Sequence, residues 1–174
     1  MSDDALTAAI AAREADLVAL TRTLVQVPTL NPPGLHYREI CERLGARLEA
    51  QGFYVRLVRA TGAPADSERY PRWNMVARRE GPRPGDCVHF NGHHDVVEVG
   101  HGWTTDPFGA EVKDGRVYGR GSCDMKDGIA ASVVAAEAFL AIHPDFAGAV
   151  EISITADEES GGYGGVAYLA EHGY

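Results

Sequence analysis

The 174-residue sequence lacks paired cysteines, an excess of basic residues and a long apolar run. Its three cysteines, Cys41, Cys87 and Cys123, are far apart and form no Cys-x-x-Cys pair, which argues against a disulfide framework or a thiolate zinc site. They are typical of reduced thiols, so we expect a cytoplasmic protein. With 16 basic and 25 acidic residues the net charge is -9, the wrong sign for nucleic acid or an anionic membrane surface.

The sequence pattern also predicts neither a membrane-spanning segment nor an export signal. The start, Met-Ser-Asp-Asp, has no basic segment ahead of an apolar core, so no signal peptide is expected. The longest weakly polar run, residues 128–142, contains Glu137 and is shorter than the roughly 20 residues that span a bilayer. At 45% hydrophobic, the chain is instead long enough for one domain with an apolar core.

Hydrophobic periodicity predicts a layered α/β domain. Helical spacing is present in the first two dozen residues and again in 37–48, with Gly52 placed to end the second helix. Alternation predicts strands at 53–57, 74–78, 87–91 (a buried strand) and 150–154, a hairpin around 113–116, and helices at 128–142 and 164–172, with a surface loop at 62–71. We therefore expect a mixed β-sheet flanked by helices, with sites beyond the carboxyl ends of strands.

The first polar cluster, Gly92-His93-His94-Asp95, comes directly after the strand expected at 87–91. In extended backbone, residues two apart point the same way, so His93 and Asp95 can face one cleft while His94 points away as a structural neighbour. A carboxylate that accepts one ring proton leaves the other imidazole nitrogen free to bind zinc. The same His-x-Asp pair also fits a hydrogen-bonded turn without metal.

The second cluster is a glycine-rich loop, residues 119–128, that leads into a helix. Its glycines permit close or left-handed turns, which could aim Asp124 at a metal. The alternative is an ordinary helix entry, in which Asp124 or Asp127 caps the first turn.

The third cluster, Asp157-Glu158-Glu159, crowds three carboxylates at the end of a core strand. Like charges this close repel, and a cation beside them relieves the repulsion. Adjacent glutamates could then divide the work, one binding metal and the other moving protons. A solvated acidic turn is the alternative. Together the clusters offer one imidazole and several carboxylates, a donor set that suits zinc, cobalt or manganese.

At these residues the sequence resembles the metallopeptidase family of acetylornithine deacetylase, succinyl-diaminopimelate desuccinylase, aminoacylase and carboxypeptidase G. The family motifs appear in order, from about Leu24 to the end of the chain. They read GHHDVV from Gly92, Trp103 followed by DPF from Asp106, DGRVYGRGSCDMK from Asp114, and DEESGG from Asp157.

The resemblance implies a zinc-exopeptidase-like catalytic domain that holds two zinc ions, with cobalt or manganese as substitutes. His93 would bind one metal, Asp124 would bridge both and Glu159 would bind the other. Asp95 would orient His93, and Glu158 would be the general base in hydrolysis of an amide bond. The substrate would be an N-acyl amino acid or a related small molecule, and in relatives the peptide after Asp124 is often cis.

The resemblance also implies that residues 1–174 are only the N-terminal part of that catalytic domain. Relatives carry a further carboxylate ligand, a final histidine ligand and an inserted lid and dimerisation domain, so the complete protein would be a homodimer. With three of five ligands the isolated chain is expected to be inactive without the C-terminal half. The alternatives are a dipeptidase or carboxypeptidase of the same family, or a non-catalytic binding domain that keeps the fold.

Overall fold

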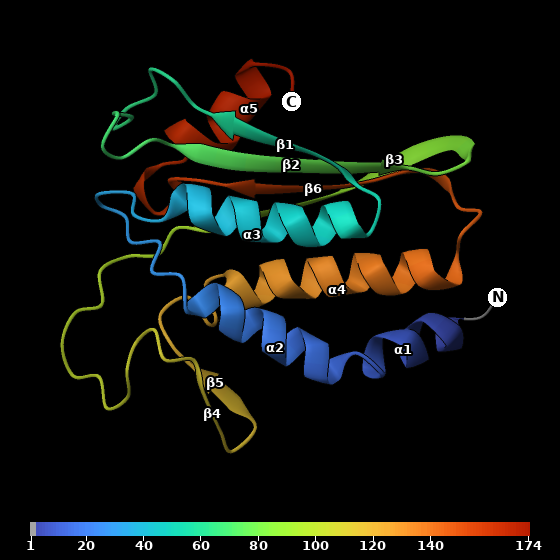
Figure 1. Cartoon of the computed structure of the whole chain (residues 1–174), viewed down its shortest axis with the longest axis horizontal. Coiled ribbons are helices and arrows are strands. Elements are labelled where there is room, and N and C mark those ends of the chain that lie inside the picture. The colour runs from blue at the N-terminus through green and yellow to red at the C-terminus, as the bar shows by residue number, and fades with distance from the viewer. Residues whose placement is uncertain (1–2) are drawn as a thin grey trace.

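A computed structural model describes residues 3–174 as a mixed four-stranded sheet with helices on both faces (Figure 1). The strands lie in the order β1 (Tyr54–Arg59), β2 (Trp73–Glu80), β6 (Ala147–Thr155) and β3 (Arg83–His93). β2 is antiparallel to both of its neighbours, whereas β3 and β6 are parallel. The predicted layered α/β architecture with a mixed sheet is confirmed. No helix among residues 3–174 is long and apolar enough to span a bilayer.

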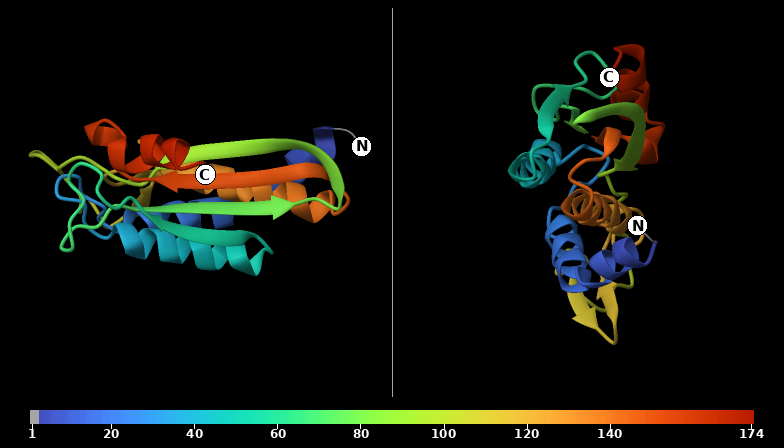
Figure 2. Two further views of the ribbon diagram at one scale, coloured as in Figure 1. Left: turned by 90° about the horizontal axis from the view of Figure 1, so that it is seen from above. Right: turned by 90° about the vertical axis from the view of Figure 1, so that its right-hand side faces the viewer.

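Four helices cover one face of the sheet in two layers. α3 (Tyr37–Ala50) packs on β1 and β2, and α4 (Lys126–Ile142) packs on β3 and β6. α1 (Asp3–Ala11) and α2 (Glu14–Val25) lie outside α4, as the end-on view shows (Figure 2). The core between sheet and helices is aliphatic, and its most deeply buried members include Leu24, Ile40, Leu44, Leu48, Met75, Ile129, Val133, Ile152 and Ile154.

The single helix expected over the first two dozen residues is two helices. Arg13 leaves helical geometry, with φ -105° and ψ 13°, and the break between α1 and α2 lets both contact α4. Met1 and Ser2, on which part of that prediction and the prediction about export rested, lie outside the described residues.

The strand expected to be buried at 87–91 exists, but it is exposed over most of its length. β3 is an outer strand of the sheet, with only β6 beside it among the described strands, and Val88 is 57% exposed. Helix α4 covers one face of β3, which accounts for the apolar residues in this strand. The pattern of apolar residues reports a covered face but not whether the strand is central or at the edge of the sheet.

Two short segments complete the chain. The expected hairpin is β4 (Glu111–Lys113) and β5 (Arg116–Tyr118), and its turn residues Asp114 and Gly115 both have positive φ. The helix expected at 164–172 is shorter: α5 (Tyr168–Glu171) follows η2 (Tyr163–Ala167), a turn that is kinked at Gly165. A Cβ at Gly165 would lie 1.9 Å from the carbonyl oxygen of Ala156, so this glycine allows a close backbone approach.

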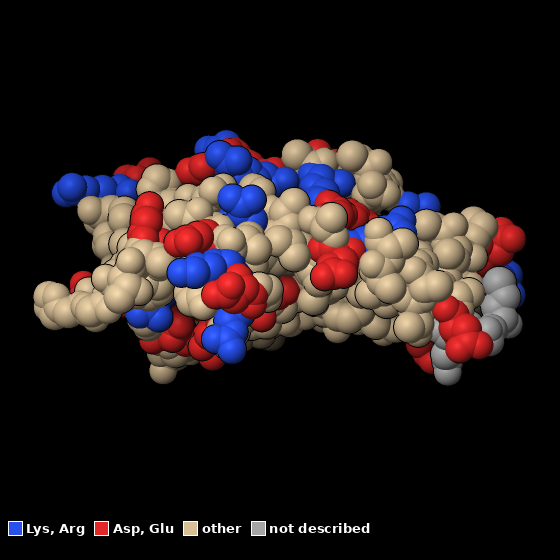
Figure 3. Space-filling model, turned by 90° about the horizontal axis from the view of Figure 1, so that it is seen from below, with Lys and Arg blue, Asp and Glu red and all other residues tan. Residues whose placement is uncertain are grey.

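Acidic and basic side chains alternate on the surface below the helices. Figure 3 shows this face, where red and blue groups are interspersed rather than gathered into patches of one sign. On α3, oppositely charged side chains one helical turn apart form ion pairs, such as Arg38 with Glu42 and Arg43 with Glu39. Exposed pairs of this kind contribute little to stability.

Candidate metal centre

The parallel pair β3 and β6 brings two of the polar clusters to one edge of the sheet. His93, the last residue of β3, lies opposite Thr155, the last residue of β6. Asp95 follows β3, and the short helix η1 (Glu158–Ser160) follows β6. The glycine-rich loop that precedes α4 supplies Asp124, two residues before the helix begins. Because parallel strands end at the same edge, residues more than 60 positions apart in the sequence meet here.

Three of the predicted ligands converge. His93, Asp124 and Glu159 each offer a nitrogen or oxygen atom, and these atoms lie within 4.8 Å of one another. The Nε2 atom of His93 is 3.0 Å from Oδ1 of Asp124 and 3.8 Å from Oε2 of Glu158. The imidazole is only 5% exposed, whereas the side chains of Asp124 and Glu158 are 74% and 59% exposed. The cluster therefore lies at the surface with its histidine embedded.

Asp95 lies behind His93, on the side away from Asp124. The Nδ1 atom of His93 is 3.0 Å from the carbonyl oxygen of Asp95 and 3.4 Å from its carboxylate. A proton on Nδ1 is satisfied by these two groups, which leaves Nε2 directed at Asp124. The same carboxylate accepts hydrogen bonds from the backbone N–H groups of Glu158 and Glu159, at 3.1 and 3.2 Å.

The electrostatics of the cluster favour a cation at the Nε2 side of His93. Burial alone would lower the pKa of His93, but its hydrogen bonds to Asp95 and Asp124 outweigh burial and raise the pKa to about 9. Burial and the negative charge of Asp124 raise the pKa of Glu159. The carboxylates of Asp124 and Glu159 repel each other, and a cation between them would relieve this repulsion. Together with the imidazole of His93 they form a donor set that fits a divalent metal ion.

The loop before α4 has the conformation that its glycines permit. Gly121 has φ +84°, and a Cβ there would lie 2.6 Å from the Val96 side chain. The peptide between Asp124 and Met125 is cis. Asp124 does not cap α4: the N-cap position is Met125, which makes no side-chain capping hydrogen bond. Asp127, in the first turn, accepts a hydrogen bond from the N–H of Gly128 at 2.7 Å. The carboxylate of Asp124 is instead directed at His93.

The three adjacent carboxylates of the third cluster separate. Glu158 and Glu159 face the histidine, but Asp157 has φ +62° and its side chain turns into the interior. There Nε of Arg72 lies 2.9 Å from Oδ2, and the hydroxyl of Tyr37 donates to Oδ1 at 3.1 Å. Burial raises the pKa of Asp157 in spite of both partners. Asp157 is thus a structural residue held by Arg72. The sequence pattern singled out neither Arg72 nor this role of Asp157.

Asn31 is a second residue that the sequence pattern did not single out. Its side chain lies between Asp95 and the turn at 157–160. The Asn31-Pro32-Pro33-Gly34 segment forms a turn. Nothing in this segment indicates that the asparagine contacts Asp95 of the first cluster, because the contact spans more than 60 residues of sequence.

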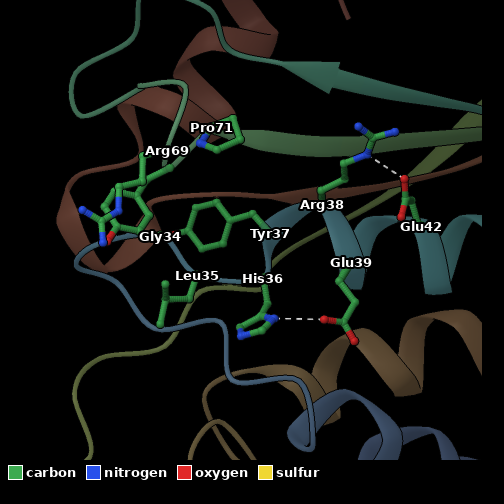
Figure 4. A pocket seen from close by; sticks show the side chains of 10 residues that line it. Gly34, Leu35, His36, Tyr37, Arg38, Glu39, Glu42, Arg69 and Pro71 are labelled. Atoms are coloured by element: carbon green, nitrogen blue, oxygen red, sulfur yellow. Dashed lines mark hydrogen bonds and ion pairs between the residues drawn. The ribbon is translucent and has the colours of Figure 1, made fainter.

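A pocket of about 380 Å³ opens beside the start of α3 (Figure 4). It contains none of the five predicted site residues. Its wall includes Tyr37, and the pairs His36–Glu39 and Arg38–Glu42 lie along its rim. The chemistry of the metal-ligand cluster therefore lies outside this pocket.

His94 is fully buried and points away from the cluster, as predicted. Its Nε2 lies 2.9 Å from the carbonyl oxygen of Trp73, and its ring meets that of Tyr37 edge to face. Nδ1 has no hydrogen-bond partner among the described residues. Burial lowers the pKa of His94 from 6.5 to about 4, because a proton on Nδ1 would be buried without an acceptor.

We expect a matching loss of stability in acid. The folded-state pKa lies below the unfolded value, so between pH 6.5 and 4 the unfolded chain binds more protons. The contribution of His94 is complete above about pH 6.5 and falls by about 3 kcal/mol as the pH drops through that window. Urea unfolding at several pH values should give a shallower pH dependence for His94→Gln than for the wild type. An exposed control, His101→Gln, should keep the wild-type slope, and equal slopes for all three proteins would contradict the assignment.

A layered α/β domain with imidazole and carboxylate groups gathered beyond its strand ends is typical of metal-dependent hydrolases. Residues 89–174 match the model of peptidase family M20/M25/M40. The resemblance predicted from the sequence is confirmed by this match and by the relatives described next.

Among curated proteins, a succinyl-diaminopimelate desuccinylase of Acinetobacter baumannii is 37% identical over 159 residues, which are 90% of this chain and 38% of the relative. Among solved structures, human carnosine dipeptidase 1 superposes with a TM-score of 0.81 at 24% identity, over 96% of this chain and 37% of that one. A dinuclear metal-binding M20 peptidase of Bacillus subtilis gives 0.63 at 19% identity, over 93% and 40%. These two structures establish the fold. The chain spans only about 38% of the length of the curated relatives it matches.

Proposed function

We propose that this chain is the N-terminal part of the catalytic domain of a two-metal amidohydrolase that cleaves N-acyl amino acids. The observation that carries the proposal is the convergence of His93, Asp124 and Glu159 to within 4.8 Å, with Glu158 beside them. The succinyl-diaminopimelate desuccinylase relative, at 37% identity, favours an acyl-amino-acid substrate over a peptide.

The residues would divide the work as follows. His93 and Glu159 would each hold one zinc ion, and Asp124 would bridge the two. When bound, such ions supply a Lewis acid and a water of lowered pKa. Asp95 keeps the His93 ring in place by accepting from Nδ1, so that Nε2 remains available.

Glu158 is the proposed general base. Its carboxylate is 59% exposed and 3.8 Å from His93 Nε2, so it stands at the cluster without being enclosed by it. It takes a proton from the attacking water and later passes this proton to the departing amine. The hydrogen bond from its backbone N–H to Asp95 fixes the position of the turn from which the side chain extends.

Three ligands cannot complete the shells of two metal ions, since each zinc takes about four. We propose that the remaining ligands come from the part of the protein outside this chain. Residues 1–174 alone should bind zinc weakly and show no amidase activity, whereas the full-length protein should bind tightly and hydrolyse N-succinyl or N-acetyl amino acids. Zinc titration by calorimetry and a panel of N-acyl amino acids and dipeptides test this. Full activity of the isolated chain would contradict the proposal, and preference for dipeptides would favour a dipeptidase.

A further inference from the structure

Behind the metal-ligand cluster, one buried amide touches both of the segments that carry the site. Asn31 lies in the turn after α2 and is 4% exposed. Its backbone N–H donates to the carbonyl of Val96 at 2.9 Å, and the N–H of Val96 donates to Thr29 at 3.0 Å. These bonds attach the turn to the segment that follows Asp95, so the place of the Asn31 side chain is fixed by the backbone.

The two protons of the Asn31 amide have two short acceptors. Nδ2 lies 2.8 Å from Oδ2 of Asp95 and 2.9 Å from Oγ of Ser160. A third oxygen, Oδ1 of Asp157, is at 3.4 Å, and Tyr37 already donates to it. Since an amide nitrogen has only two protons, Asp95 and Ser160 take them. The amide thus joins the residue behind His93 to the last residue of the turn that carries Glu158 and Glu159.

The Asp95 carboxylate is held by donors from three segments. It is fully buried, and its two oxygens receive the Asn31 amide, the backbone N–H groups of Glu158 and Glu159, and the Nδ1 side of His93. A buried carboxylate needs such donors to remain charged. Asn31 is its only donor among the described residues that comes from neither of the site-bearing segments.

We propose that Asn31 is a positioning residue, which holds the Asp95 carboxylate and the turn at 157–160 so that His93, Glu158 and Glu159 move as one unit. This inference rests on the function proposed above. The Asn31 amide makes no hydrogen bond to His93, Asp124 or Glu159, so its effect on the site would pass through Asp95. Residues of this kind, which orient metal ligands, typically change metal affinity or activity by about 10- to 100-fold when removed.

The test is Asn31→Asp in the full-length protein. The change keeps the shape of the side chain but replaces both donors with a charge beside Asp95, so one of the two carboxylates must take up a proton or move. We expect kcat to fall by about 10- to 100-fold with little change in KM, and the Kd for Co²⁺ of the metal-free protein to rise by a similar factor. Visible absorption during Co²⁺ titration measures that Kd independently of turnover.

A matched control is Asn91→Asp, which makes the same chemical change two residues before His93. Asn91 is exposed and bonds to Ser153, so kcat and Kd should stay within about threefold of the wild type. Asn31→Ala provides a second variant, without added charge, in case the aspartate prevents folding. It should show the same losses, smaller in size.

Unchanged Co²⁺ affinity and kcat in a folded Asn31 variant would overturn the positioning role. A fall in melting temperature alone, with both values unchanged well below that temperature, would equally overturn it and make Asn31 merely structural. A wild-type protein that binds Co²⁺ but cleaves no amide would refute the proposed function, while the Co²⁺ titration would still decide the role of Asn31.

Discussion

A Glu158→Gln variant of the full-length protein is expected to lose about 10²- to 10⁴-fold in kcat, because the amide cannot accept the proton of the attacking water. Metal affinity should stay close to that of the wild type. Glu158 is not among the three residues whose ligand atoms converge within 4.8 Å, and its backbone contact with Asp95 survives the substitution.

Steady-state kinetics and metal analysis of the same preparation separate the two roles. Glu111→Gln is a matched control. Glu111 is exposed on the β4–β5 hairpin, and its substitution removes the same charge at a position outside the candidate site. Near-normal kcat in Glu158→Gln would remove Glu158 as the base. Loss of metal from this variant would instead make Glu158 a ligand.

Replacing Arg72 by methionine is expected to destabilise the fold by about 3–5 kcal/mol. The side chains of Arg72 and Asp157 are only 2% and 5% exposed, so Asp157 would lose its ion partner inside the protein. Arg72 also donates to the carbonyl of Pro33 at 2.7 Å, which joins the turn before α3 to the same network. Removing one member of a buried pair leaves an uncompensated charge, which costs more than the pair contributes.

Urea unfolding followed by circular dichroism measures this loss. Adding Asp157→Asn to Arg72→Met should recover part of it, because a neutral amide tolerates burial better than an unpaired carboxylate and asparagine tolerates the positive φ at this position. Arg38→Met is the exposed control: Arg38 is 64% exposed in its pair with Glu42, and its loss should cost less than about 1 kcal/mol. Equal losses for Arg72 and Arg38 would contradict the role of the buried pair.

Helices and strands with strong hydrophobic periodicity were predictable from sequence. Where they begin and end, and how deeply they are buried, was predicted less well. The spacing of Ile40, Leu44 and Leu48 places one face of α3 on the sheet, and all three are buried. The same reasoning missed the break between α1 and α2 and the exposure of β3. Periodicity describes one segment at a time, whereas burial depends on which neighbour lies beside it.

The candidate site divides in the same way. The motifs single out His93, Asp95, Asp124, Glu158 and Glu159, and the structure brings these residues to one edge of the sheet. Their roles as ligands and base stay predictions. The motifs did not predict that Asp157 turns away from its two neighbours, because a single left-handed residue ends the alternation of side chains that holds within a strand.

By itself, the sequence determined the order of the strands and of the longer helices α3 and α4, the donor types of the site and the resemblance to a metallopeptidase family, since each depends on residues close together in the chain. Only the tertiary structure decided which side chains stand behind the site. The contact of Asn31 with Asp157 spans 126 positions and that of Tyr37 with Asp157 spans 120. Such contacts arise when β3 and β6 pair in parallel and the segments beyond them pack together, and no local pattern encodes that pairing.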